Sequence, residues 1–156
     1  MDQLTESKRV YHDLFWFVDQ QSQLDNSMYL HFIAWREFQK DNEIRCFVYH
    51  SNLVAITQYD LEKPTILSNN EASCVHVLDK LVQFLSDKIP YQDYVIDVEI
   101  DPGISIYVIE FNPWGLYGTT SPVLFDWEKD AAILYNENIT TVCVRTQRHG
   151  YKTRME

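Results

Sequence analysis

Two polar residues stand two positions apart in a stretch that otherwise has the composition of a strand, YVIEFNPWG. They are Glu110 and Asn112, and their side chains point to one face because alternate residues of a strand share a face. A buried carboxylate and a buried amide both need polar partners. Their oxygens are also the ligands that Mg²⁺ prefers in proteins. The spacing therefore indicates either a metal site or a buried salt-bridge network.

A second carboxylate, Asp97, lies in the preceding predicted strand, YVIDVEI, and a turn signal at residues 101–103 separates the two strands. If Pro102 and Gly103 are the two central turn residues, Asp97 faces Val108 and lies diagonal to Glu110 on one face. This face is then also expected to hold Ile104, Ile106 and Val108. A slip of one residue would turn Asp97 to the other face, so the prediction depends on the length of the turn.

The natural counter-charge for these carboxylates is Arg45, in the alternating stretch EIRCFVY. In the salt-bridge alternative, a buried arginine pairs with Glu110 and Asn112 caps the turn at Pro113. In the metal alternative, Arg45 binds a phosphate oxygen of a metal-bound ligand bidentately. The sequence leaves both alternatives open.

The elements that must position these residues follow from hydrophobic periodicity. Strands are predicted at residues 29–35, 43–49, 53–59, 94–100 and 104–111, with a final strand pair from AAILY and ITTVCVRT. A tight turn at Ser51-Asn52 makes the second and third strands a hairpin. Helices are predicted at about residues 5–21 and from a capping box at Ser68 and Glu71 to Pro90. The apolar stripe of the second helix consists of Cys74, Leu78, Leu81, Leu85 and Ile89. The stretch VLFDWEKD is expected to be a helix start or a short turn.

Length and composition predict one α+β domain, residues 1–156, with a largely antiparallel sheet and flanking helices. Residues 1–28 form its N-terminal helix and linker, and residues 29–156 form the sheet with its helices. No apolar run is long enough to cross a bilayer. A net charge of −10 argues against a nucleic-acid partner. Three widely spaced cysteines without a secretory signal favour reduced core residues and a cytoplasmic location.

Several stretches occur in an order and spacing that is similar to a known family. They are EIRCFVYHSNLVAITQYD (43–60), YVIDVEI (94–100), YVIEFNPWG (107–115) and LFDWEKD (124–130). Together they resemble the cell-division-cycle-123 family, ATP-grasp-like assembly factors for eukaryotic translation initiation factor 2. Within the third stretch, IEFNP resembles the closing metal-binding strand of ATP-grasp enzymes.

The resemblance implies a fold like the C-terminal lobe of an ATP-grasp protein, with ATP and Mg²⁺ as cofactors. It implies that Asp97, Glu110 and Asn112 hold Mg²⁺ on ATP, that Arg45 contacts a phosphate and that Trp35 lines the nucleotide. It assigns no catalytic residue.

The sequence also departs from the family pattern. Glu110 replaces an aspartate, Ile33 and Ala34 replace an Arg-Lys pair, and Ser121-Pro122 interrupts a Thr-Asp-Ser run. The chain is expected to be N-terminally shortened and to lack the lobe whose lysine reaches the nucleotide phosphates.

The leading hypothesis is a shortened ATP-grasp-like protein that binds Mg-nucleotide weakly and acts as a protein-binding assembly factor for translation initiation factor 2. One alternative is an ATP-dependent carboxylate–amine ligase completed by a partner subunit. The other is a non-catalytic interaction module whose polar residues are inherited core residues.

Overall fold

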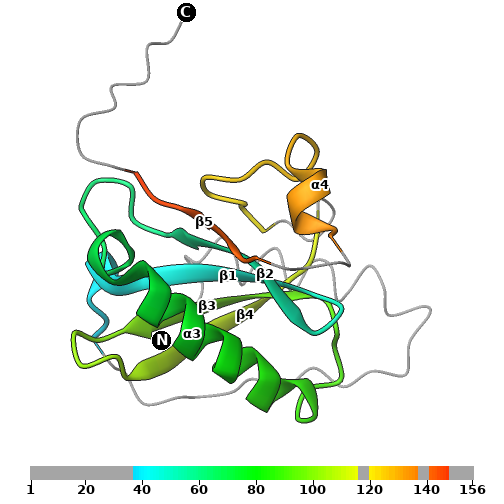
Figure 1. Ribbon diagram of the computed structural model, residues 1–156, viewed down its shortest axis with the longest axis horizontal. Coiled ribbons are helices and arrows are strands. Elements are labelled where there is room, and N and C mark those ends of the chain that lie inside the picture. The colour runs from blue at the N-terminus through cyan, green and yellow to red at the C-terminus, as the bar shows by residue number, and fades with distance from the viewer. Residues whose placement is uncertain (1–36, 116–119, 137–140, 148–156) are drawn as a thin grey trace, which may run out of the picture. The chain divides into compact units, whose positions relative to one another are not determined.

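A computed structural model describes residues 37–115, 120–136 and 141–147, all within one compact unit, Glu37–Glu156. Its core is a five-stranded sheet in the order β4-β3-β1-β2-β5 (Figure 1). The strands are β1 (Glu43–Tyr49), β2 (Asn52–Gln58), β3 (Tyr94–Ile100), β4 (Ile106–Pro113) and β5 (Cys143–Arg145). The described helices are η1 (Lys40–Asn42), α3 (Leu67–Ser86) and α4 (Ala131–Leu134). The predicted helix at 5–21 and strand at 29–35 lie outside the described residues.

The sheet is mostly antiparallel. Strand β1 pairs antiparallel with both β2 and β3, β3 pairs antiparallel with β4, and β5 alone runs parallel to its neighbour β2. Helix α3 lies across one face of the sheet (Figure 1). These pairings confirm the predicted α+β class with a largely antiparallel sheet. No helix of the described residues combines the length and apolar character needed to cross a membrane.

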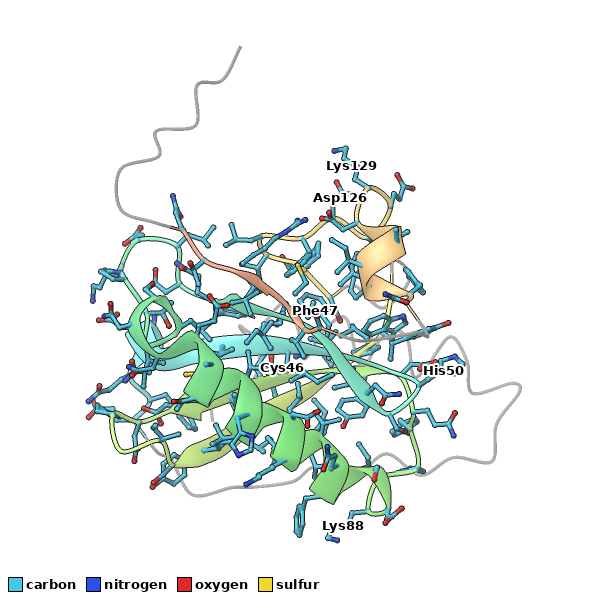
Figure 2. The ribbon with its side chains drawn as sticks, viewed as in Figure 1. Cys46, Phe47, His50, Lys88, Asp126 and Lys129 are labelled. Carbon is cyan, nitrogen blue, oxygen red and sulfur yellow. The ribbon has the colours of Figure 1, made fainter. Side chains whose placement is uncertain are left out.

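The β1–β2 hairpin confirms the predicted alternation. Cys46 belongs to the core cluster under α3, whereas its neighbour Phe47 belongs to a second cluster on the other face (Figure 2). The two central residues of the turn are His50 and Ser51, with φ of 49° and 61°. Two consecutive positive φ values match the right-handed twist of a hairpin. The predicted turn was therefore one residue late, because Asn52 already pairs with Tyr49.

The β3–β4 hairpin contains two irregularities that the predicted register did not include. Residues 101–105 make a longer turn, in which Ile104 adopts a φ of 65° and Asp101 N–H donates to the Ser105 carbonyl at 3.0 Å. Further along, Val98 pairs with Val108 but Asp97 pairs with Glu110, so Ile109 is the extra residue of a bulge.

Relative to the predicted register, the longer turn and the bulge each shift the pairing by one residue. The two shifts together return the side chains of β4 beyond the bulge to the faces that were predicted for them. Asp97 and Glu110 consequently share a face, as predicted, but they lie directly opposite each other rather than diagonally. The predicted pairing of Asp97 with Val108 is wrong. The placement of Ile104, Ile106 and Val108 on the face of Glu110 is also wrong. Ile106 pairs with Ile100 and Val108 with Val98, which are core residues on the α3 face.

Helix α3 buries Leu67, Cys74, Leu78 and Val82. The predicted stripe is confirmed within the helix, because Leu81 and Leu85 pack at the edge of the same core. The predicted end at Pro90 is wrong, because α3 ends at Ser86 and Ile89 packs on the core from the segment after the helix. The predicted capping box is wrong. The N-cap residue is Ile66, no side chain caps the helix, and Asn70 interrupts the first turn with φ −134° and ψ 32°.

The stretch AAILY forms the short helix α4 rather than a strand. Leu134 N–H donates to the Asp130 carbonyl at 3.0 Å, and the Leu134 side chain is buried beside Phe47. An apolar run of this length suits either a strand or a helix, and here packing against the sheet decides. Residues 124–130 form turns, as one of the two expectations for them stated.

Candidate functional site

The sheet face opposite α3 is divided into an apolar half and a polar half. The apolar half consists of Phe47, Val54, Ala55 and Val95 of the sheet, covered by Phe125, Trp127 and Leu134. The polar half consists of Arg45, Thr57, Asp97, Glu99, Glu110 and Asn112, brought together by strands β1 to β4. The first four of these polar residues are almost entirely buried. A buried polar surface on a sheet requires internal partners.

Arg45 lies at the centre of this polar half. Its Nε donates to Asp97 Oδ1 at 2.7 Å, and its Nη2 donates to Asp97 Oδ2 at 2.6 Å. The third nitrogen, Nη1, donates to the backbone carbonyl of Ser121, and the guanidinium lies 4.8 Å from the ring centre of Tyr59. Such two-pronged pairing fixes the plane of the guanidinium as well as its position. Sequence reasoning predicted Arg45 as the counter-charge of the two carboxylates, and the two-pronged pairing with Asp97 confirms this for Asp97.

Asn112 connects the two carboxylates. Its Nδ2 donates to Asp97 Oδ2 at 3.0 Å and to Glu110 Oε1 at 3.2 Å. The predicted role of Asn112 as a cap of the turn at Pro113 is therefore replaced by a bridging role. The register explains the geometry. Asn112 pairs with Val95, two residues along the strands from the Asp97–Glu110 pair, so its side chain lies on the same face and next to that pair.

Burial has the largest effect on the pKa values of the polar half. Burial raises the pKa of Asp97, the hydrogen bonds from Arg45 oppose this, and the charge of Glu110 adds to it. The pKa of Glu43, at the edge of the site, is raised by burial and then by the charge of Asp97. Burial lowers the pKa of Arg45, but the hydrogen bonds to Asp97 and the charges of Asp97, Tyr59 and Glu110 together outweigh burial and raise it. A cation that approached these carboxylates would compete with protons.

The donor set suits a hard cation that uses few protein ligands. Two carboxylates and one amide oxygen match the needs of Mg²⁺, which takes its remaining ligands from water and phosphate. Within the described ranges, no group of three or more His, Cys, Asp or Glu residues is arranged to hold a metal ion. A carboxylate offers about four lone-pair positions. Hydrogen bonds from Arg45 and Asn112 occupy three of these positions at Asp97, so a metal ion would have to compete with them.

The structure brings together four of the five predicted site residues: Arg45, Asp97, Glu110 and Asn112. The fifth, Trp35, lies outside the described residues. Sequence reasoning missed Glu99, whose Oε1 accepts the Gln39 N–H at 2.9 Å, and Tyr59, which lies beside Arg45. Strand parity was the available signal for Glu99, since it stands two residues after Asp97 on the same strand. No sequence signal predicted the contact with the Ser121 carbonyl.

The chain is similar to proteins that carry descriptive names. The family model described as D123 matches residues 3–152. A "translation initiation factor eIF2 assembly protein" of Danio rerio is 36% identical over 100 residues, which cover 61% of this chain and 27% of that protein. A "cell division cycle protein 123" of Phaeosphaeria nodorum is 29% identical over 113 residues, which cover 70% of this chain and 29% of that protein.

The fold is similar to that of a solved structure, Cdc123 from Schizosaccharomyces pombe. The TM-score is 0.75 at 28% sequence identity, and the match covers 93% of this chain and 58% of that chain. Among the curated relatives, the matched share of the relative's own length ranges from 27% to 36%. The chain therefore spans about a third of the length of the curated relatives that it matches.

Proposed function

Because the chain belongs to the D123 family, we propose that it is a cytoplasmic, protein-binding assembly factor for translation initiation factor 2 that also binds Mg-nucleotide weakly. The observation that carries the proposal is the match of the D123 model to residues 3–152. The names of the relatives supply the partner, since several are described as assembly proteins for this factor. The arrangement of the polar half supports the part of the proposal that concerns binding of Mg-nucleotide.

The nucleotide part of the proposal rests on Arg45, Asp97, Glu110 and Asn112. Three neighbouring strands deliver these four side chains to one patch, and the hydrogen bonds among them hold it together. Asp97, Glu110 and the Asn112 amide oxygen would hold Mg²⁺, which would screen the phosphate charge from the carboxylates. Arg45 would contact a phosphate oxygen, and Trp35 would line the nucleotide.

Weak binding is expected from the bonds that already exist in the patch. Both Asp97 oxygens accept hydrogen bonds from Arg45, and one also accepts from Asn112. A phosphate contact would require Arg45 to give up part of this pairing. A buried charge that loses its partner is costly, so the exchange subtracts from the binding free energy.

Calorimetry with Mg-ATP tests the nucleotide part. Glu110→Gln removes one ligand charge with little change in shape, and we expect the binding heat to fall sharply. Glu128→Gln, an exposed site outside the patch, is the matched control and should bind like the wild type. Equal heats in wild type and Glu110→Gln, with both chains folded by circular dichroism, would remove the nucleotide claim.

Binding of the purified initiation factor tests the partner part separately. We expect a complex with translation initiation factor 2 in size-exclusion chromatography, with and without Mg-ATP. Absence of the complex under both conditions would overturn the partner assignment and leave the nucleotide result unaffected.

A further inference from the structure

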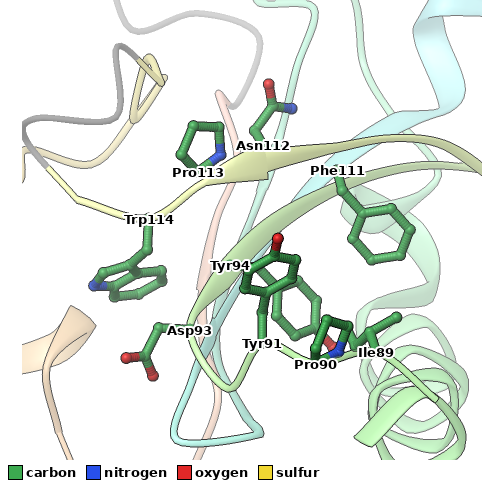
Figure 3. Close-up of a pocket in the computed structure, with 9 residues that line it drawn as sticks. All are labelled: Ile89, Pro90, Tyr91, Asp93, Tyr94, Phe111, Asn112, Pro113 and Trp114. Carbon is green, nitrogen blue, oxygen red and sulfur yellow. The ribbon is translucent and has the colours of Figure 1, made fainter. Parts of the chain in front are cut away.

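A cavity of about 620 Å³ lies where β3 begins and β4 ends, next to the segment that follows α3. Aromatic and proline side chains dominate its walls, with Pro90, Tyr91, Tyr94, Phe111 and Trp114 among them. Figure 3 shows the rings of Tyr91, Tyr94 and Phe111 gathered on one side, with Trp114 and Asp93 on the other. A volume of this size and an apolar lining are typical of a binding pocket.

The aromatic walls are open to an incoming partner. The side chains of Tyr91 and Phe111 are 68% and 45% exposed, and the rings of Tyr94 and Phe111 lie 5.6 Å apart. Exposed aromatic side chains of this kind are the usual anchors of a protein interface, because they offer a large contact area and lose little conformational entropy.

Two hydrogen-bond donors on the lining residues have no acceptor within the described part of the chain. They are the Tyr94 hydroxyl and the Trp114 Nε1–H, both buried. Burial raises the pKa of Tyr94 to about 12, so its hydroxyl keeps its proton at neutral pH. A buried donor without an acceptor is uncommon and costs free energy. Neither atom has surface that solvent can reach, so a ligand in the open pocket would not meet them, and the two unpaired donors are a feature of the fold itself.

The pocket also has a defined charge. Asp93 lines it, and its Oδ1 accepts the His50 N–H at 2.7 Å, which fixes the carboxylate in place. Among the lining residues that the structure describes, no other is an aspartate, glutamate, lysine, arginine or histidine. With the net charge of −10 over the chain, the electrostatics favour a ligand that carries a basic group.

We propose that this pocket binds a proline-rich segment of a protein partner in the polyproline II conformation, with a basic residue of that segment beside Asp93. Polyproline II is an extended conformation without internal hydrogen bonds, so its proline rings are free to pack against the exposed rings of Tyr91 and Phe111. Grooves lined by aromatic rings recognise such segments, because the rigid prolines pack between the rings with little further loss of entropy. The inference deepens the partner-binding part of the proposed function, and Asn112 is the one described residue of the polar half that also lines this pocket.

Titration of the full chain with synthetic peptides tests the proposal. The probe peptide repeats Pro-x-x-Pro with a flanking arginine, one control peptide has alanine in place of every proline, and another has glutamate in place of the arginine. Binding is followed by the indole N–H signal of Trp114 in a ¹H–¹⁵N spectrum, assigned with Trp114→Phe. We expect the proline-rich probe to shift this signal and both control peptides to bind at least about tenfold more weakly.

Variants of the chain locate the binding. Tyr91→Ala should weaken the peptide affinity about tenfold or more, as the loss of an anchoring aromatic does. Phe84→Ala, which removes a similarly exposed aromatic on α3 away from the pocket, is the matched control and should leave the affinity unchanged. Asp93→Asn keeps an acceptor for His50 and should abolish the preference for arginine over glutamate.

Several results would overturn the proposal: no shift with the proline-rich probe, equal binding of the alanine peptide, equal loss in Phe84→Ala, or a concentration-dependent dimer that Tyr91→Ala dissolves. The titration contains neither magnesium nor nucleotide. Failure here therefore leaves the calorimetry and the initiation-factor complex as independent results.

Discussion

Arg45 and Asp97 face each other on the neighbouring strands β1 and β3 and form two parallel hydrogen bonds, of 2.7 and 2.6 Å, in a site where both side chains are buried. The pair connects the centre of the sheet to the loop that provides the Ser121 carbonyl. Its two strands also carry the core beneath α3. The pair therefore contributes to the stability of the fold whatever the patch binds.

Removing one member of this pair is expected to destabilise the fold strongly. Arg45→Met leaves the Asp97 carboxylate buried without its cation, and the free energy of unfolding should fall by about 3–5 kcal/mol. The double variant Arg45→Met/Asp97→Leu should lose less than the two single variants combined. Urea unfolding of the four proteins measures this coupling as a double-mutant cycle.

The exposed ion pair between Lys63 and Asp41, at 3.0 Å, is the matched control. Lys63→Met should leave the urea midpoint nearly unchanged, because exposed pairs contribute little. Additive losses in the buried cycle would contradict a direct interaction between Arg45 and Asp97.

The turn between β1 and β2 offers a stabilising substitution. Ser51 has a φ of 61°, a conformation that costs a residue with a side chain about 1 kcal/mol and costs glycine almost nothing. Ser51→Gly keeps the hydrogen bond from its N–H to the Gln92 carbonyl, so the urea midpoint should rise. Ser73→Gly, in the middle of α3, should lower the midpoint, because glycine is unfavourable within a helix. A fall in both variants would contradict the positive φ at Ser51.

The ion pair between Asp130 and Arg145 predicts a dependence of stability on pH. Hydrogen bonds of 2.6 and 2.7 Å from Arg145 lower the pKa of Asp130, although burial opposes the shift. A carboxyl group with a lowered pKa stabilises the fold above its unfolded pKa, and this contribution is lost as the pH falls through the folded pKa. Asp130→Asn should therefore lower the urea midpoint at pH 7, and the gap from wild type should be narrower at a pH below the usual pKa of an aspartate. A gap that stays constant between these pH values would exclude the ion pair as its cause.

The cysteines are expected to differ in reactivity. Cys46 is 1% exposed, and burial raises the pKa of its thiol above the usual range. Burial also raises the pKa of Cys74. Only the thiolate reacts with iodoacetamide, so both residues should remain unmodified in the folded chain and react in urea. Mass spectrometry of the peptides checks this, with the half-buried Cys143 as the internal comparison. Rapid labelling of Cys46 in the folded chain would contradict its place in the core.

Local patterns predicted the elements with long periodic signals. The alternation in 43–49 and the stripe from Cys74 to Ile89 fixed β1 and α3, because each pattern repeats several times and only one face can be buried. AAILY is too short to repeat any pattern, and its helix depends on contacts of Leu134 with residues far away in the sequence. The helix start at Ile66 was missed because nothing local marks it.

The candidate site was predicted in composition but not in register. Strand parity identified Glu110 and Asn112 together, and the turn signal identified Asp97 as their neighbour. The positive φ of Ile104 could not be predicted, since isoleucine is among the residues least suited to it. The bulge at Ile109 likewise has no signature in its own sequence. The prediction that Asp97, Glu110 and Asn112 lie together is therefore confirmed, whereas each predicted cross-strand pair was displaced.

The bulge of the β3–β4 hairpin affects how its sequence can change length. Ile109 is unpaired, so losing it alone would leave Asp97 opposite Glu110 and Val95 opposite Asn112, with their side chains on the same face as before. The loss of a second residue within β4 would have no unpaired residue to absorb it, and would turn one part of the strand to the other face. The hairpin should therefore tolerate the loss of one residue near Ile109 with the polar patch retained, whereas further losses within β4 should disrupt the patch.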